Sequence, residues 1–596
     1  MTTRIFKMRK GHTSLLFVLC SFLFSVALTS CSDFLEVKDL NTTLLEDYWT
    51  QKSDVDDVVN SCYVVLTEND ARERMMIWGE GRSDNVAGGY DIINKADLYN
   101  VVRENITARN GYTTWGSFYT VINRCNTVLK YAPMLGDVDP SYTRADLKAT
   151  IAEMTALRSL CYFYLIRTFR DVPYTTVPYT DDDQKMALPA TPFYDVLDSL
   201  ITSLERVKGD AVTRYPETEP RDQTGRITRD AIYAMLCEMY LWKKDYANCI
   251  RYAELVAESK KAAFLDNVNK STSLITVKEA EQMLQRTNGY PLVCNAASVS
   301  NFGEFYRDIF IKGSSYETIF ELAYADNPGG SSIANDAISF LYGNNREKKG
   351  ALIVSETLTS DATKLAGVYS DCKYHDSRLY INFDSNNAYI TKYATSRQPV
   401  KVDKDNVNEN ESALSNKRDY YSDKQNGSKW IIYRMSDIML LEAEALCQQM
   451  LDGNDTTATN FNKPLLDQAF TLVNAINKRA ICKNTLQDAD TLKRSAYTSK
   501  SAMTKLVERE RRRELMFEGK RYYDLVRYAM RDGNTTQILE AMGSRDDVNG
   551  TYVTNFFKRM DAIFWPYNYE EMRVNHSLVP NPAFGSGDSN SYEKTN

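Results

Sequence analysis

The spacing of apolar residues predicts a chain built mostly from helices. In residues 54–66, 115–132 and 150–170, apolar side chains recur three or four positions apart, which is the spacing of one helix face. In the last of these segments the shared face carries Leu157, Cys161, Tyr164, Leu165 and Phe169. The pattern stops before Pro173, because proline lacks the backbone N–H that continues a helix.

Residues 228–257 predict two helices joined by a tight turn. Thr228 is placed to cap the first helix, and Lys244-Asp245-Tyr246 supply the turn. The spacing of small and apolar residues across this pair resembles a tetratricopeptide helix–turn–helix, although any antiparallel helix pair with small contact residues can show it. Residues 433–446 and 464–480 form a second candidate pair, and such pairs stack to bury faces that one pair leaves exposed.

Glycine-rich and polar stretches interrupt the helices. Residues 79–91 hold four glycines between two helical segments and are turn-like. Residues 380–430 are polar and rich in asparagine, with no helical or strand period, and much of 485–500 and 531–550 is similar. Long irregular segments in a folded domain are commonly functional or else disordered. We therefore expect an irregular, loop-rich half beside the helical one.

The first 30 residues have the pattern of a secretory signal. Four cations, no acid and an apolar run at 14–28 precede the boundary Leu28-Thr29-Ser30-Cys31, which resembles a bacterial lipobox. We predict that residues 1–30 are cleaved and that Cys31 carries the lipid, since stable anchoring takes two or more acyl chains. An uncleaved anchor is the alternative, but the apolar run is short for a span of ~20 residues. A secreted form without lipid would leave Cys31 unexplained.

Charge and residue counts exclude several classes of function. The formal net charge is −7, and loss of the four signal cations makes it −11, so we predict no nucleic-acid partner. Outside the signal only His375 and His576 remain, too few for a zinc site of the H-E-x-x-H type, although a Ser-His-Asp triad stays open. The nine cysteines beyond Cys31 include no C-x-x-C pair, and we interpret them as buried apolar residues rather than disulfides. No metal or cofactor is predicted.

Residues 506–528, LVERERRRELMFEGKRYYDLVRY, carry a dense charge pattern. The pattern predicts two helices with a left-handed glycine cap at Gly519 between them. Glu508 is spaced to meet Arg511 and Arg512 along one helix. Further pairs at helical spacing are Glu510–Arg513, Arg511–Glu514, Arg521–Asp524 and Asp524–Arg527. The charges nearly cancel, so we interpret the segment as a structural charge network rather than a phosphate site.

This segment resembles the signature near the C-terminus of the SusD/RagB family, the nutrient-binding outer-membrane lipoproteins of Bacteroidetes. The family pattern is E-R-R-x-E-L-x-F-E-G followed by R-x-x-D-L-x-R. The matching residues are Glu510, Arg511, Arg512, Glu514, Leu515, Phe517, Glu518, Gly519, Arg521, Asp524, Leu525 and Arg527. Other segments match the family in the same order: 31–37, 115–129, 157–174, 317–330, 433–446 and 564–584. Arg170 replaces a usual glycine, and Ala583-Phe584 replaces Gly-Tyr.

The resemblance implies a mostly α fold, in which a tetratricopeptide-like helical repeat scaffold supports an irregular, loop-rich, ligand-binding half. It divides the chain into the lipoprotein signal peptide at 1–30, an N-terminal SusD-like helical region at 31–285, and a C-terminal RagB/SusD region with long loops and returning helices at 286–596. The chain beyond the signal is long for one compact core, so we expect at least two packed units.

The resemblance also implies a cell-surface lipoprotein that binds a glycan and delivers it to a SusC-like TonB-dependent transporter, without catalysis. The lipid would hold the protein on the outer membrane, facing the cell exterior. A peptide ligand, as in RagB-like uptake proteins, is one alternative. A surface glycosidase with paired carboxylates is a second, and a purely structural helical adaptor is a third, which the long aromatic loops disfavour.

The ligand site is predicted from the residues themselves, because the family matches mark scaffold positions. Sugars present flat CH faces and many hydroxyls, so a site needs aromatic rings beside hydrogen-bonding groups. The loop 79–91 offers one wall and the irregular half offers the other. The predicted site residues are Trp78, Asp84, Asn85, Tyr90, Tyr324, Asn327 and Tyr342. The alternative is a plain connector with Trp78 in the core.

We expect Cys31→Ser to release the protein from membranes, because the variant lacks the thiol to which the acyl chains attach. Fractionation of cells that express either form measures this after a high-salt wash of the membranes. A Cys31→Ser variant that remains with the outer membrane contradicts lipid attachment at this residue.

Overall fold

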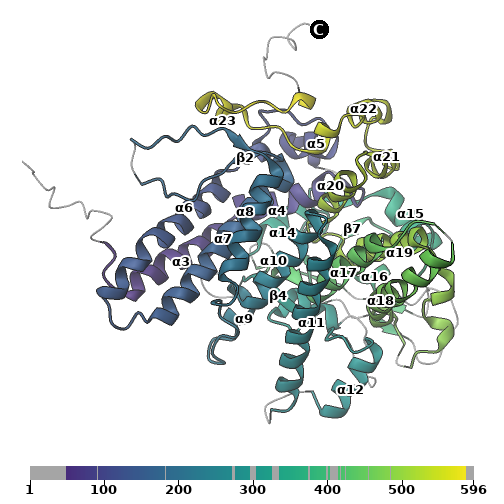
Figure 1. Cartoon of the computed structure of the whole chain (residues 1–596). Helices are drawn as coiled ribbons and strands as arrows, with labels where there is room; N and C mark the ends of the chain where they lie inside the picture. Colours follow the sequence, from purple (N-terminus) through teal and green to yellow (C-terminus); the bar gives the residue numbers. More distant parts are fainter. Residues whose placement is uncertain are drawn as a thin grey trace, which may run out of the picture. The chain divides into compact units, whose positions relative to one another are not determined.

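Helices dominate the structure and stack as neighbouring pairs (Figure 1). The stacked helices are α3 (Lys52–Thr67), α6 (Gly116–Tyr131), α7 (Arg144–Phe169), α8 (Phe193–Val207), α10 (Arg229–Trp242), α11 (Tyr246–Val268), α17 (Met435–Gln449), α18 (Thr456–Ala480) and α19 (Lys500–Leu515). Helix α6 packs on α3 and α7, α7 packs on α8, α10 packs on α11, and α17 packs on α11, α18 and α19. The predicted mostly α, tetratricopeptide-like scaffold is confirmed.

The computed structural model describes residues 48–89, 91–180, 183–270, 275–294, 304–324, 334–372, 376–397, 400–402, 414–416, 418–422, 425–453, 455–483 and 485–584. From Gln51 onward the described residues form one compact unit, whereas two or more were expected. The reason is the contact between α11 and α17, which joins the sequence regions on either side of residue 285. No helix among the described residues is long and apolar enough to cross a membrane.

The helix pair predicted at residues 228–257 forms as α10 and α11. The hydroxyl of Thr228 accepts a hydrogen bond from the backbone N–H of Ala231 at 3.3 Å, so the predicted cap is confirmed. The thiols of Cys237 and Cys249 lie 3.7 Å apart where the two helices touch. All nine described cysteines are buried with free thiols, as small apolar contact residues should be.

Two predicted helix starts and one predicted irregular segment differ from the structure. Helix α7 begins at Arg144 and α18 at Thr456, each earlier than the apolar pattern, because polar caps at Thr143 and Asp455 start them. The segment 531–550, predicted to be irregular, contains α21 (Thr536–Gly543) and the start of α22 (Gly550–Phe556).

The remaining α-helices of the described residues are α4 (Asn69–Met76), α5 (Ala96–Val102), α9 (Asp222–Gly225), α12 (Val277–Arg286), α13 (Glu304–Arg307), α14 (Asp336–Leu341), α15 (Glu356–Lys364), α16 (Arg378–Ile381), α20 (Arg521–Asp532) and α23 (Tyr569–Val574).

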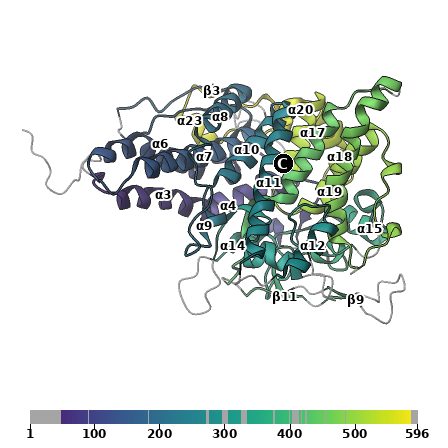
Figure 2. The ribbon, with the colours of Figure 1, turned by 60° about the horizontal axis from the view of Figure 1, so that its bottom comes forward.

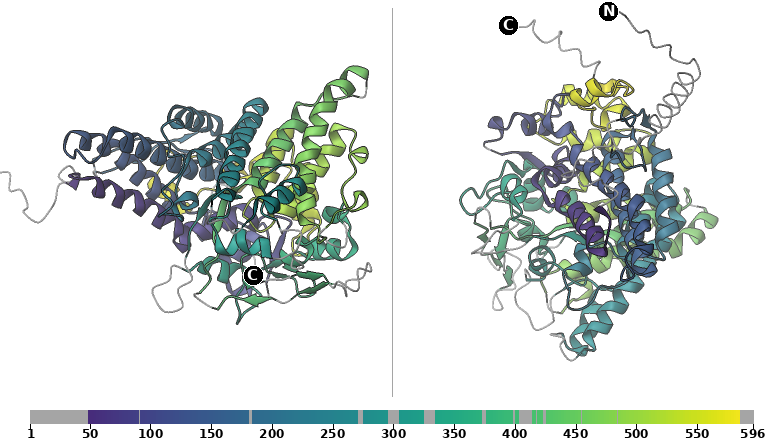
Figure 3. Two further views of the ribbon diagram at one scale, coloured as in Figure 1. Left: turned by 90° about the horizontal axis from the view of Figure 1, so that it is seen from below. Right: turned by 90° about the vertical axis from the view of Figure 1, so that its left-hand side faces the viewer.

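The strands of the described residues form six short two-stranded ladders, and all but β2–β3 include strands between Thr318 and Arg434, in the irregular half. The antiparallel pairs are β1 (Val86–Gly88) with β5 (Leu352–Val354), β2 (Val172–Pro173) with β3 (Ala190–Thr191), β4 (Thr318–Leu322) with β12 (Trp430–Arg434), β6 (Phe383–Asp384) with β7 (Tyr389–Ile390), β8 (Thr395–Arg397) with β11 (Asp419–Tyr420), and β9 (Val400–Val402) with β10 (Leu414–Asn416). Figure 2 shows α14, β11 and β9 at the bottom of the view, with α8 and α20 at the top. Figure 3 (left) shows these teal to green segments below the blue and green helices.

A buried network of ten charged side chains joins the helical scaffold to the irregular half. Its members are Arg378, Lys392, Arg434, Arg479 and Arg513, with Glu317, Asp376, Glu510, Glu514 and Glu518, and none is more than 2% exposed. Arg434 lies at its centre, with ion pairs to Glu317 at 2.9 Å and to Glu514 and Glu518 at 2.7 Å each. Five positive and five negative charges balance, and the structural interpretation of residues 506–528 is confirmed.

The individual ion pairs of residues 506–528 differ in part from those predicted. Two predicted pairs form: Glu510–Arg513 at 2.5 Å and Asp524–Arg527 at 2.9 Å. The others reach distant elements instead: Arg511–Asp437 at 2.7 Å, Arg512–Asp84 at 2.9 Å, Arg521–Asp84 at 2.8 Å and Glu508–Arg531 at 3.3 Å. Asp437 lies on α17, Asp84 in the early loop and Arg531 on α20, so these charges pair across the tertiary structure rather than along their own helix.

Gly79 and Gly519 bring two backbones into direct contact. A Cβ atom added at Gly79 would lie 1.8 Å from the carbonyl oxygen of Gly519. Gly519 itself has a φ of +67°, the left-handed conformation that was predicted for it, but it is not the helix cap that was predicted, because α19 ends at Leu515 with Met516 as its cap. The early loop is therefore held against the turn that follows α19.

We expect Gly79→Ala to lower the free energy of unfolding by about 3 kcal/mol, because the added methyl group collides with a backbone that cannot move aside. Urea denaturation followed by circular dichroism measures the change. The matched control is Gly116→Ala, where a Cβ atom has nothing within 4 Å and should leave stability unchanged. Equal stability of both variants contradicts the close approach.

Candidate functional site

The structure brings the early glycine-rich loop and the irregular half side by side. The loop leaves a π-helical turn at Ile77–Gly81 and continues into β1. Strand β1 pairs with β5, so that Val86 lies opposite Val354 and Gly88 lies opposite Leu352. The two sequence regions predicted as walls of one site are thus neighbours in space.

Glycines permit the close packing of this junction. The N–H of Gly89 donates to the carbonyl of Ala351 at 2.9 Å, and a Cβ atom at Gly89 would lie 2.4 Å from the carbonyl oxygen of Gly350. A Cβ atom at Gly350 would in turn lie 2.2 Å from the carbonyl oxygen of Leu341. Because these glycines have no side chain, the backbone segments can pack directly against one another, and this packing fixes the position of the side chains around them.

Trp78 lies in the core of the helical scaffold. Its side chain is fully buried, its ring stacks on Phe118 with 5.0 Å between ring centres, and its indole N–H donates to the carbonyl of Tyr112 at 2.8 Å. The core position was the alternative interpretation of this residue, and the geometry agrees with it.

Asp84 and Asn85 are buried beside the charge pairs of α19 and α20. Burial opposes ionisation of Asp84, yet Arg512 and Arg521 hold the pKa of its carboxyl well below the usual range. The side chain of Asn85 donates to Glu80 at 2.7 Å and accepts from Arg512 at 2.8 Å. Burial raises the pKa of Glu80 to about 7, while its hydrogen bond from Asn85 acts in the opposite direction.

Tyr324 and Tyr342 also have internal partners. The hydroxyl of Tyr324 donates to the carbonyl of Thr67 at 3.3 Å, and that of Tyr342 donates to the carbonyl of Phe517 at 3.1 Å. Both rings are buried. In this structure, therefore, none of the five described residues of the predicted site offers a surface to a ligand. Tyr90 and Asn327 lie outside the described residues and stay predictions.

Half-buried aromatic rings and exposed basic groups lie on segments close in sequence to these buried residues. Lys95, next to α5, has its Nζ 5.3 Å from the centre of the Phe340 ring on α14, and Lys348 has its Nζ 5.9 Å from the centre of the Tyr420 ring on β11. The N–H of Asn345 donates to the carbonyl of Tyr421 at 2.7 Å, which joins the α14 turn to β11. We name the set Lys95, Phe340, Asn345, Lys348 and Tyr420 the ladder surface, since it borders the β1–β5 ladder.

The ladder surface has the chemistry that a sugar face requires. Phe340 and Tyr420 are half-buried, and Lys95, Asn345 and Lys348 are exposed. Half-buried rings are held in place, and here a lysine ammonium lies over each of them. Aromatic rings can contact sugar CH groups, and amide and ammonium groups can bond hydroxyls. Sequence reasoning missed Phe340 and Tyr420, because the contact that joins their segments, between Asn345 and Tyr421, spans 76 residues of the chain.

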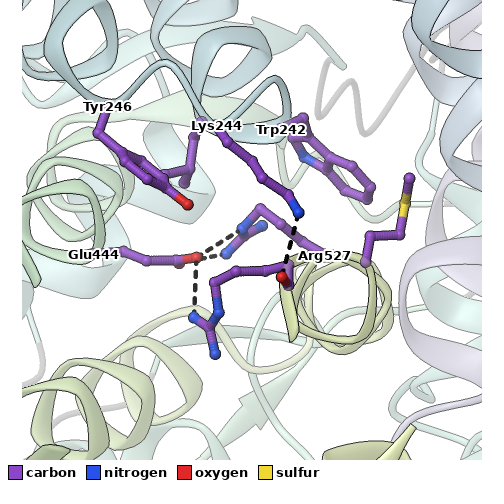
Figure 4. A pocket seen from close by; sticks show the side chains of 8 residues that line it. Trp242, Lys244, Tyr246, Glu444 and Arg527 are labelled. Atoms are coloured by element: carbon purple, nitrogen blue, oxygen red, sulfur yellow. Dashed lines mark hydrogen bonds and ion pairs between the residues drawn. The ribbon is translucent and has the colours of Figure 1, made fainter. Parts of the chain in front are cut away.

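A small pocket between α10, α11, α17 and α20 does not suit a saccharide (Figure 4). Its volume is about 10 Å³, which is room for about one water molecule. Two arginines close it: Arg527 binds Glu444 at 2.7 Å, and the carbonyl of Arg531 accepts a hydrogen bond from Lys244 at 3.2 Å. It is a packing junction of the scaffold.

Among the described residues no three His, Cys, Asp or Glu side chains are grouped to hold a metal ion.

Two family models match this chain, each over a different part of it. Residues 313–584 match the model described as the SusD family, and residues 33–241 match the model described as starch-binding associating with outer membrane. Two SusD-like proteins of Formosa agariphila are 23% and 21% identical, each over 94% of this chain and 96% of their own.

Solved structures show the same fold. A SusD superfamily protein from Bacteroides thetaiotaomicron has a TM-score of 0.57 at 21% identity, over 90% of this chain and 99% of its own. One from Bacteroides vulgatus has a TM-score of 0.59 at 16% identity, over 90% and 100%. A laminarin-binding SusD-like protein has a TM-score of 0.55 at 18% identity, also over 90% and 100%.

Proposed function

The chain belongs to the SusD family, and on that premise we propose that it binds a glycan on the ladder surface. The observation that carries the proposal is the pair of half-buried rings, Phe340 and Tyr420, each with an exposed lysine nearby. A solved relative of the same fold is named as laminarin-binding. Rings of this kind stack on sugar CH faces, while Asn345 and the lysines supply hydrogen bonds to hydroxyls.

Binding without turnover fits the state of the carboxylates. A glycosidase needs two carboxyl groups about 5–10 Å apart on either side of an accessible bond. Glu510, Glu514 and Glu518 lie close together in sequence, but all three are buried and ion-paired. They serve the scaffold and offer no such pair to a substrate. The absence of a catalytic step rests on the resemblance to the SusD family.

The proposal extends to anchoring and delivery. The lipobox at Cys31 supports attachment to the outer membrane by lipid, and residues 33–241 match a model described as associating with outer membrane. From that position, facing the cell exterior, the protein would pass its glycan to a SusC-like TonB-dependent transporter. Co-purification of such a transporter after gentle detergent extraction supports this step, and a protein that is always recovered alone contradicts it.

We expect Phe340→Ala and Tyr420→Ala each to weaken glycan binding by roughly tenfold, since each removes the stacking area of one ring. Isothermal titration of the full chain with laminari-oligosaccharides and a panel of other neutral glycans measures the loss. Tyr194→Ala is the matched control, because Tyr194 is 44% exposed on α8, which is not part of the ladder surface.

The same titration separates the alternatives. Full affinity in the Phe340→Ala/Tyr420→Ala double variant, for a glycan that binds the parent, places the site elsewhere. New reducing ends after incubation indicate a glycosidase. Binding of peptides but of no glycan indicates the RagB-like alternative.

A further inference from the structure

A groove lies between α17, α18 and α19, where the turn after α17 meets the first turns of the other two helices. Its volume is about 490 Å³, within the range of ligand pockets in proteins. Five of its lining residues lie on α18 between Thr459 and Leu466, and the turn after α17 and the segment that leads into α19 supply the rest. None of them belongs to the ladder surface.

The wall of this groove is held in place by Asn462. Its side-chain oxygen accepts a hydrogen bond from the N–H of Leu451, and its side-chain nitrogen donates to the carbonyl of Leu451, both at 2.8 Å. Asn462 is only 6% exposed, so water competes little for these bonds. The turn after α17 is therefore fixed on α18, and the groove is preformed.

The groove is basic although the chain is acidic. Lys463, Arg494 and Lys500 line it together with a single acid, Asp452, whereas the whole chain carries −7. Asp452 pairs with Lys500 at 3.1 Å, but its side chain is 90% exposed, so solvent screens the pair and an incoming anion can replace the carboxylate. The Nε atom of Arg494 forms an ion pair with a carboxylate oxygen of Asp467 at 2.8 Å, which helps to orient the guanidinium.

The rest of the lining suits a sugar ring. Thr459, Thr498 and Ser501 bring hydroxyl groups, and Asn460 brings an amide. Leu451, 44% exposed, offers an apolar face to CH groups. Helix α19 has no acidic residue in its first turn, so the positive end of its dipole adds to the attraction for an anion.

We propose that this groove is a second saccharide site, and that it takes an acidic sugar, one that bears a carboxylate or a sulfate. The choice of a saccharide rests on the proposed function, whereas the acidic group follows from the charges of the groove itself. The cations would bind the acidic group through charge-assisted hydrogen bonds, and the hydroxyls and amide would bind the ring. The ladder surface and this groove would then differ in the charge of the sugar that they bind.

The test is calorimetric titration of the full, lipid-bearing chain in detergent with tri-galacturonic acid, with a sulfated chondroitin disaccharide and with the neutral maltotriose. We expect the parent to bind at least one acidic probe, and the Lys463→Gln/Lys500→Gln double variant to lose tenfold or more of that affinity. Lys505→Gln, an exposed residue of α19 outside the groove, is the matched control and should bind as the parent does.

Each outcome decides between alternatives. Binding of only the uronate or only the sulfated probe supports the site and identifies the acidic group. No binding of either probe, or equal affinity in the double variant, overturns the proposal, as does inorganic sulfate that competes as strongly as the sugar. Phe340→Ala/Tyr420→Ala should leave acidic-probe binding intact, so failure of the ladder surface and failure of this groove are separate results.

Discussion

The buried network around Arg434 is the interaction on which the rest of the structure depends. Arg434 is the last residue of β12 and directly precedes α17. Its guanidinium forms ion pairs with Glu514 on α19, with Glu518 shortly after that helix, and with Glu317 directly before β4. Burying a charge costs several kcal/mol unless close partners replace its hydration. Here each charge has such a partner, and the partners come from segments far apart in sequence. The network can be satisfied only when the helical stack and the irregular half are both in place.

This requirement explains why the two halves form one unit. Removing one member of a buried ion pair destabilises a protein by about 3–5 kcal/mol, because the charge left behind has no water to solvate it. A separate pair of ion pairs fixes the loop that runs toward β1, since Arg512 and Arg521 both bind Asp84. Of the proposed ladder surface, Lys95 lies at the start of α5, Phe340 on α14 and Tyr420 on β11. The buried network contributes no side chain to it.

Sequence patterns predicted the scaffold well and the site poorly, for a physical reason. Helix periodicity and the Thr228 cap depend on residues within a few positions of one another, and both were confirmed. The site depends on which side chains the tertiary structure leaves exposed. Trp78 and Tyr342 have the right chemistry for a sugar, but the fold buries both. The role proposed for Phe340 depends on packing that brings Lys95 beside it, and no local pattern records such a contact.

Amide hydrogen exchange of the full chain, compared between the parent and Glu514→Gln, tests the role of the network most directly. Glu514 binds Arg378 on α16, Arg434 on β12 and Arg479 on α18. Loss of its charge should leave these three arginines short of a partner, so the account predicts faster exchange in α16, β12 and α18 together. Faster exchange confined to α19, the helix that carries residue 514, would contradict it.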